Sequence, residues 1–152
     1  MTDKIDIQKV KSDAEENFRC GNFYCSESII SSIRKNIDPD MPEAFIAAAS
    51  GFPIGVGRSK CMCGAISGAI IGLGYFFGRT EGKDPKVNKT LELANEIQMS
   101  FQEKHKVSCC KILTKGMDMA SGEHKAQCIQ FTGEMAEKVA EVIARELNIE
   151  TV

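Results

Sequence analysis

The sequence predicts an all-α fold, a compact bundle of about five to six helices around a central glycine-rich helix. Two observations lead to this fold class. Apolar residues recur at intervals of three and four along the 152 residues, which is the spacing of a helix face. No repeat, low-complexity tract or linker divides the chain, so residues 1–152 are expected to form a single domain. A chain of this length buries roughly 70% of its unfolded surface, so its core needs no covalent cross-link.

The first third of the chain is predicted to contain three helices. The first apolar stripe consists of Ile7, Val10, Ala14 and Phe18. The second consists of Cys25, Ile29 and Ile33 and ends near Asn36, ahead of two prolines, which places Cys25 on the inward face. A short helix over residues 43–49 follows. The glycine- and proline-rich residues 50–58 are expected to form an irregular loop.

The central helix is predicted to begin between Cys61 and Gly64 and to continue to about Phe77. Gly64, Gly68 and Gly72 are spaced by four, so one helix face carries almost no side chains. Another backbone or a bound group can approach that face closely. Each interior glycine costs about 1 kcal/mol relative to alanine, which tight packing must offset. The same face would suit a contact between subunits equally well, so the sequence also allows a homodimer.

Two longer helices are predicted in the second half. Asp84 as N-cap and Pro85 at the first position begin a helix that fades near His105. Its predicted stripe consists of Val87, Leu91, Ala94, Ile97 and Phe101. Residues 107–113 fit either a short helix or an extended segment. Ser121 caps the last helix, whose stripe of Cys128, Phe131, Met135, Val139 and Val142 places Cys128 on the buried face.

Charge and hydropathy argue against several classes of partner. The formal net charge is −2 with both signs interspersed, so there is no broad basic surface for nucleic acid. Residues 61–78 form an uncharged run of 18 residues, but five are glycine and one is serine, so we expect a buried helix and no membrane span. The N-terminal residues lack the apolar core of a signal peptide, which predicts a cytoplasmic protein with reduced thiols.

The seven cysteines are the main indication of function. They make up about 4.6% of the chain, below the roughly 8–10% of disulfide scaffolds, and their number is odd. In a reducing compartment such a chain points to metal binding or redox chemistry. Cys61 and Cys63 lie at the predicted start of the central helix, downstream of Arg58 and Lys60, where helix dipole and cations favour thiolate. The alternative is that both are small core residues.

The other cysteines narrow the candidate site. Cys109 and Cys110 are adjacent, so their side chains diverge and only one should face a given site. Cys20 lies in a turn and is interpreted as a spare thiol, with a further ligand as the alternative. The candidates that remain are Cys25, Cys61 or Cys63 or both, Cys109 or Cys110, and Cys128. Four ligands from separate segments suit a closed metal or cluster site.

The histidines offer one alternative to the four-cysteine site, and several common cofactor-binding motifs are absent from the sequence. His124 lies four residues before Cys128, a helical spacing that would let both contact one zinc ion. His105 has no such neighbour and is interpreted as a polar residue at a helix end. The chain has no phosphate-binding loop, no complete dinucleotide fingerprint, no c-type haem motif and no Cys-x-x-Cys.

The segment Gly-Phe-Pro-Ile-Gly-Val-Gly-Arg over residues 51–58, followed by Cys-Gly-Ala-Ile-Ser-Gly over residues 63–68, resembles the signature of the redox-active C_GCAxxG_C_C family. Cys25, Cys63, Cys110 and Cys128 match the order of the family's cysteines, and the similarity covers roughly residues 17–147. The resemblance implies a small helical redox domain with these four cysteines as its active group. Cys61 and Cys109 depart from the pattern, since each duplicates a family cysteine nearby.

Three functional hypotheses follow. The leading one is an electron-transfer or redox-sensing protein that holds an iron–sulfur cluster, with [2Fe–2S] favoured. The ligands would be Cys25, Cys63, Cys110 and Cys128, and the protein would serve an unknown redox partner. The second is a metal-free thiol–disulfide protein in which Cys61 or Cys63 attacks and Cys109, Cys110 or Cys128 resolves. The third is a zinc-stabilised interaction module that uses cysteines with His124. Catalysis on a substrate does not follow from these residues.

Overall fold

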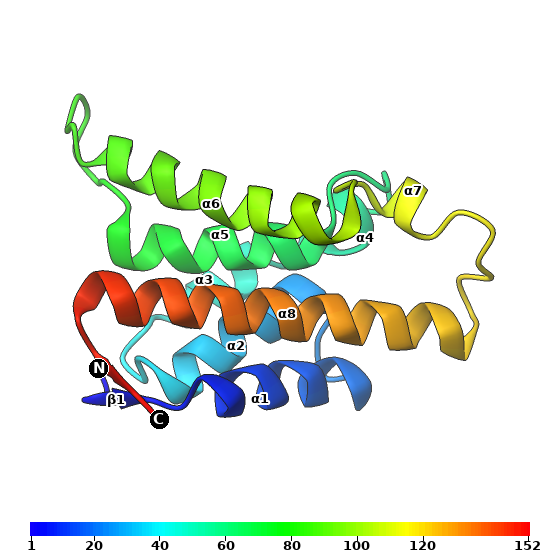
Figure 1. Cartoon of the computed structure of the whole chain (residues 1–152), viewed down its shortest axis with the longest axis horizontal. Coiled ribbons are helices and arrows are strands. Elements are labelled where there is room, and N and C mark those ends of the chain that lie inside the picture. Colours follow the sequence, from blue (N-terminus) through cyan, green and yellow to red (C-terminus); the bar gives the residue numbers. More distant parts are fainter.

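The computed structural model describes residues 1–152 and is mostly helical (Figure 1). In chain order the elements are β1 (Lys4–Ile5), α1 (Ile7–Arg19), α2 (Cys25–Asn36), α3 (Ala44–Ala48), α4 (Pro53–Val56), α5 (Gly64–Phe77), α6 (Val87–His105), α7 (Cys110–Leu113), α8 (Gly122–Leu147) and β2 (Glu150–Thr151). Six helices, α1, α2, α3, α5, α6 and α8, pack together, and α4 and α7 are short. The predicted helical fold class is therefore confirmed.

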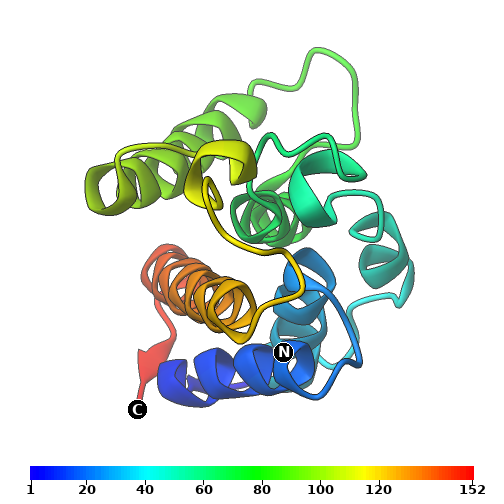
Figure 2. The ribbon, with the colours of Figure 1, turned by 90° about the vertical axis from the view of Figure 1, so that its right-hand side faces the viewer.

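The long helices lie against one another (Figure 2) and bury apolar side chains between them. Helix α1 packs on α2 and α8, while α5 packs on α2, α6 and α8. Fully buried side chains from these helices include Val10, Ile33, Ile66, Leu73, Ile97 and Val139. The hydrophobic effect on this shared core is what holds the helices together, since isolated helices of such length are marginal in water.

Both chain ends take part in a small sheet that the sequence did not predict. Strands β1 and β2 pair in parallel, with Lys4 opposite Glu150 and Ile5 opposite Thr151. Ile5 is fully buried, and the amide of Val152 donates a hydrogen bond of 3.0 Å to the Ile5 carbonyl. Two-residue strands are too short to show an alternating pattern, which explains the omission.

The glycine face of α5 lies against α2. A Cβ atom on Gly68 would lie 2.7 Å from the Cα atom of Ser26 and 2.8 Å from its carbonyl oxygen. A Cβ atom on Gly72 would lie 2.7 Å from the Ile33 side chain. Real Cβ atoms do not approach other atoms so closely, so glycine at these positions allows the two helix backbones to come together. This contact fixes the first residue of α2 beside the first residues of α5.

Two details of the predicted helix before His105 are wrong. The helix begins at Val87, and the Asp84 carboxylate accepts a hydrogen bond of 2.9 Å from the Lys86 amide in the preceding turn. Leu91 is 61% exposed, whereas Leu93 is fully buried with Ile97 and Phe101. Because α6 packs on α5 and α8 from one side, it buries a narrow stripe that runs through Leu93 and leaves Leu91 in water.

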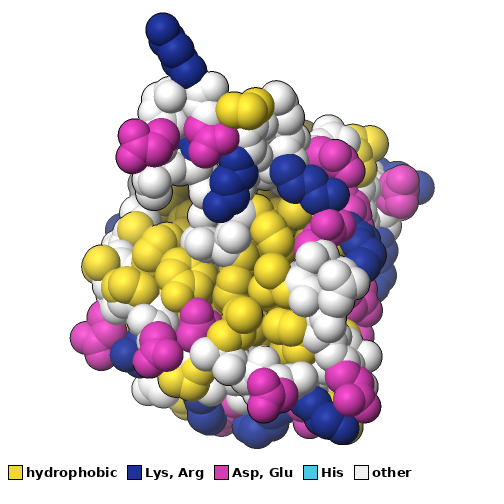
Figure 3. Space-filling model, turned by 90° about the vertical axis from the view of Figure 1, so that its left-hand side faces the viewer, with side chains coloured by type: hydrophobic (Ala, Val, Ile, Leu, Met, Phe, Trp, Pro, Cys, Tyr) yellow, Lys and Arg dark blue, Asp and Glu magenta, His cyan; other side chains and the backbone are white.

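No helix is long and apolar enough to cross a membrane. Apolar side chains nevertheless gather on the face at the left-hand end of the view in Figure 1, as Figure 3 shows. Near the C-terminal end of α5, the rings of Tyr75 and Phe76 meet edge to face with centroids 4.8 Å apart, and Tyr75 meets Phe45 at 5.0 Å. Cys63 lies at the opposite end of α5, directly before its first residue.

Candidate functional site

Four free cysteines from four segments line one cavity of about 940 Å³. Cys25 is the first residue of α2, Cys63 directly precedes α5, Cys110 is the first residue of α7, and Cys128 lies in the second turn of α8. Cys63 is buried, and the other three are half-buried. The structure thus brings together the four residues that the sequence reasoning selected, although they span more than a hundred positions of the chain.

A glycine at the start of α5 makes room for one of these thiols. A Cβ atom on Gly64 would collide with the sulfur of Cys25 and would lie 3.1 Å from the Phe52 carbonyl oxygen and 3.2 Å from the Pro53 Cα atom. Any larger residue would push either the thiol or the loop away. Gly64 therefore sets the approach of Cys25 to Cys63.

The loop before Cys63 reverses direction through a left-handed turn. Within and after α4, Ile54, Gly55, Val56 and Gly57 have φ values between 54° and 61°. For Ile54 and Val56 this backbone region is uncommon and costs of the order of 1–3 kcal/mol each. Hydrogen bonds from the Lys60 amide to the Ile54 carbonyl and from the Cys61 amide to the Gly55 carbonyl, at 3.1 Å and 3.2 Å, close the turn. The turn delivers Cys61 and Cys63 to the N-terminal end of α5.

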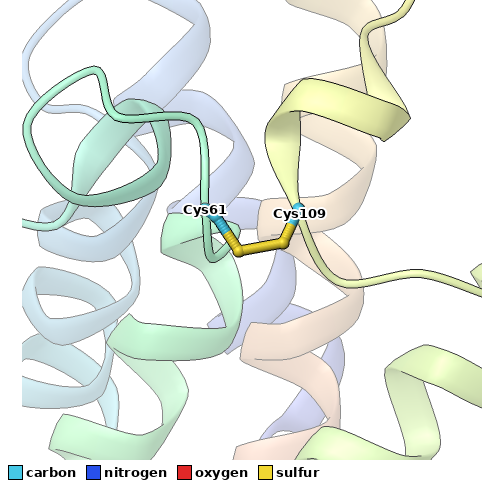
Figure 4. The surroundings of a disulfide bond; sticks show 2 residues. All are labelled: Cys61 and Cys109. Atoms are coloured by element: carbon cyan, nitrogen blue, oxygen red, sulfur yellow. A yellow bond between two sulfur atoms is a disulfide. The ribbon is translucent and has the colours of Figure 1, made fainter.

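Cys61 and Cys109, which lie close in sequence to Cys63 and Cys110, form a disulfide with each other (Figure 4). Cys61 and Cys109 are 48 residues apart and join the loop before α5 to the segment before α7. Two backbone hydrogen bonds flank this link, from Cys63 to the Ser108 carbonyl at 2.7 Å and from Lys111 to the Lys60 carbonyl at 2.8 Å. The expectation of reduced thiols is wrong for this pair. Neither cysteine lines the cavity, so they do not take part in the four-cysteine group.

The sequence spacing of the cysteines contains a signal for this pairing. Cys61 lies two residues before Cys63, and Cys109 lies one residue before Cys110. If Cys63 and Cys110 share a site, Cys61 and Cys109 lie on the two segments that meet there. The expected divergence of adjacent side chains is observed, because Cys109 enters the disulfide while Cys110 faces the cavity.

Burial and contact among the four thiols raise the pKa values of three of them and lower that of the fourth. Burial raises the pKa of Cys25 to about 12 and that of Cys128 to about 11, and repulsion from neighbouring cysteine sulfurs adds to both. The pKa of Cys63 lies well above its usual range because its thiol donates a hydrogen bond to Cys110 and is buried. Accepting that hydrogen bond lowers the pKa of Cys110 to about 7. The sequence predicted that Cys61 or Cys63 would favour the thiolate form. The cysteine whose pKa is lowered is Cys110 instead.

This ordering predicts one thiol of distinct reactivity in the metal-free protein. In a Cys20→Ser background, we expect a single thiol to react with iodoacetamide at a rate that rises through a midpoint near pH 7. The pKa of Cys110 is lowered, so its reactive thiolate is present above this pH and is lost below it. Mass spectrometry of the labelled peptides measures the rate, and Cys110→Ser should abolish it. A midpoint near pH 9 would contradict the assignment.

The two histidines have different surroundings. His124 lines the cavity, and its Nε2 lies 3.5 Å from the sulfur of Cys128. His105 contacts a Glu134 carboxylate oxygen at 2.6 Å and packs against the Phe101 and Phe131 rings, and it does not itself line the cavity. No group of three or more His, Cys, Asp or Glu side chains, the four cavity cysteines included, is positioned to hold a single metal ion.

The remaining cysteine, Cys20, is exposed at the C-terminal end of α1. It does not line the cavity. The interpretation as a spare thiol therefore agrees with its position.

Comparison with known families matches residues 23–142 to a family described as "Putative redox-active protein (C_GCAxxG_C_C)". The chain belongs to the C_GCAxxG_C_C family. The part that matches the C_GCAxxG_C_C family contains the four cavity cysteines together with Cys61 and Cys109, whereas Cys20 lies before it. Among curated proteins and solved structures, none matches the chain significantly.

Proposed function

We propose that the protein is an electron carrier or redox sensor that holds an iron–sulfur cluster, [2Fe–2S] in the simplest case, through Cys25, Cys63, Cys110 and Cys128. The observation that carries the proposal is the convergence of these thiols on one cavity. Cysteine thiolates are the usual ligands of such clusters, which contain four of them in the [2Fe–2S] type. The family description as redox-active agrees with this chemistry.

The donor set fits a cationic inorganic group. The sulfurs of Cys110 and Cys128 raise the pKa of Cys25, and the sulfur of Cys25 in turn raises the pKa of Cys63. Burying several thiolates together is costly unless a cation offsets their charge, and metal binding deprotonates coordinating thiols outright. The four cysteines therefore form a poor environment for several free thiolates, and a bound cation such as iron would offset their charge.

Backbone amides at helix starts are directed at the same sulfurs. Hydrogen bonding to the Gly64 amide lowers the pKa of Cys110, and the Ala65 and Ser26 amides act in the same direction on Cys63 and Cys25. Such hydrogen bonds stabilise negative charge on sulfur and tune the reduction potential of a cluster. The cluster, when bound, would supply one-electron chemistry, while the chain holds the thiolates and restricts water around them.

Metal and sulfide analysis tests this proposal. Protein purified without oxygen should contain about two iron and two acid-labile sulfide per chain, with visible absorption that bleaches when dithionite is added. Reconstitution of the isolated chain with ferrous iron and sulfide provides a second route to the same species. A chain that stays colourless and free of iron and sulfide after both treatments would exclude the cluster.

The disulfide favours a second candidate, a metal-free thiol–disulfide protein. Cys61 and Cys109 are already oxidised, and the thiols of Cys63 and Cys110 follow them in the sequence by two residues and by one. Oxidation of Cys63 and Cys110 by a disulfide substrate would form one S–S bond and release two thiols from the substrate, which balances electrons and protons. Alkylation with mass spectrometry before and after oxidation should detect a Cys63–Cys110 disulfide, and identical labelling in both samples would count against this function.

A further inference from the structure

The cavity beside the cysteines is larger than a cluster requires. Its volume of about 940 Å³ lies within the range of small-molecule sites, roughly 300–1,000 Å³. The four inorganic atoms of a [2Fe–2S] cluster would occupy a small part of this space. Apolar side chains form much of the remaining wall, among them Phe18, Tyr24, Leu113 and Phe131. The Phe18 and Tyr24 rings meet edge to face with centroids 6.4 Å apart, so the wall offers an aromatic surface to a ligand.

The charged side chains of the cavity are mostly cationic. Arg58, Lys60 and Lys125 line it, and none of these side chains makes a hydrogen bond or an ion pair within the chain. Glu27 is the one carboxylate in the lining, and its oxygens accept hydrogen bonds of 3.3 Å from the Tyr24 amide and from the Ser50 hydroxyl. The cations are therefore free to bind an anion, while the carboxylate is already engaged.

We propose that this cavity binds a small organic anion with an apolar body. Its acid group would pair with Arg58, Lys60 and Lys125, since hydrogen bonds between ionised groups are roughly twice as strong as neutral ones. Its apolar part would lie against Phe18, Tyr24 and Phe131, which places the ligand next to the thiols. This inference goes beyond the proposed function, because it needs the cavity and its cations but no cluster.

A pair of fluorescent probes tests the proposal on the full chain. The probe 8-anilinonaphthalene-1-sulfonate is an aromatic anion, and N-phenyl-1-naphthylamine has the same rings without the sulfonate. We expect the sulfonate to bind at one site per chain and at least tenfold more tightly than the neutral probe. The triple variant Arg58→Gln, Lys60→Gln, Lys125→Gln should remove this preference while it keeps its affinity for the neutral probe.

Two controls make the result decisive. Lys111→Gln removes an exposed cation of α7 that lies outside the cavity lining, and it should leave the preference unchanged. Cys25→Ala, which removes a proposed cluster ligand, should retain the preference, so a failed cluster and a failed anion site are distinguishable. Equal affinity for the two probes, or a triple variant that prefers the sulfonate as the wild type does, would overturn the proposal. Either result would assign the dye to apolar surface such as that in Figure 3.

Discussion

Cys25→Ala is expected to reduce bound iron and acid-labile sulfide to less than a tenth of the wild-type content. Cys25 is the half-buried first residue of α2 and lines the cavity with the other three thiols. A [2Fe–2S] cluster needs four protein ligands, and no other free cysteine lines the cavity to replace the lost one. Iron and sulfide assays with visible spectroscopy on anaerobically purified protein measure the effect.

Cys20→Ala is the matched control, because Cys20 is an exposed free cysteine outside the cavity. It should keep its full iron and sulfide content. The same pair of variants separates the two candidate functions. A thiol–disulfide protein that works through Cys63 and Cys110 would lose nothing essential in Cys25→Ala. Full iron content in Cys25→Ala would exclude the four-cysteine site.

Gly68→Ala is expected to lower the free energy of unfolding by about 2 kcal/mol or more. The added Cβ atom would lie 2.7 Å from the Cα atom and 2.8 Å from the carbonyl oxygen of Ser26. Both are backbone atoms, so no side-chain rotation relieves the overlap and α2 must move away from α5. Urea unfolding followed by circular dichroism measures the change. Because Cys25 directly precedes Ser26, the same shift should also weaken cluster binding.

Gly74→Ala on the same helix gives the opposite expectation. A Cβ atom on Gly74 meets nothing within 4 Å, so the substitution gains helix propensity without a collision. We expect the free energy of unfolding to rise by up to about 1 kcal/mol. If both substitutions changed the free energy of unfolding equally, helix propensity and not the close approach of α2 would determine the effect at Gly68.

The helices were predictable because their signals are local. Ser121 accepts a hydrogen bond from the His124 amide at 3.1 Å as an N-cap, and the apolar spacing after it continues to the end of α8. The exposed Leu91 shows the limit of such reasoning. Its spacing fits the apolar face as well as that of Leu93, and only the direction from which α5 and α8 pack decides between them.

The candidate site was predictable in its members but not in its electrostatics. Inward helix stripes and the family order selected Cys25, Cys63, Cys110 and Cys128, which line one cavity. The position of the most acidic thiol depends on which cysteine is buried and which accepts the shared hydrogen bond, so it follows from three-dimensional contacts. The left-handed run from Ile54 to Gly57 was predictable only as an irregular loop, since isoleucine and valine rarely adopt that conformation.

The Cys61–Cys109 bond closes a covalent ring that contains the whole of α5 and α6. The connection between these helices includes exposed residues from Arg79 to Lys83, which makes it an accessible place for a protease to cut. A cut there would open the ring without dividing the molecule. The nicked protein should therefore migrate as one species on a non-reducing gel and separate into two fragments when a reductant is added.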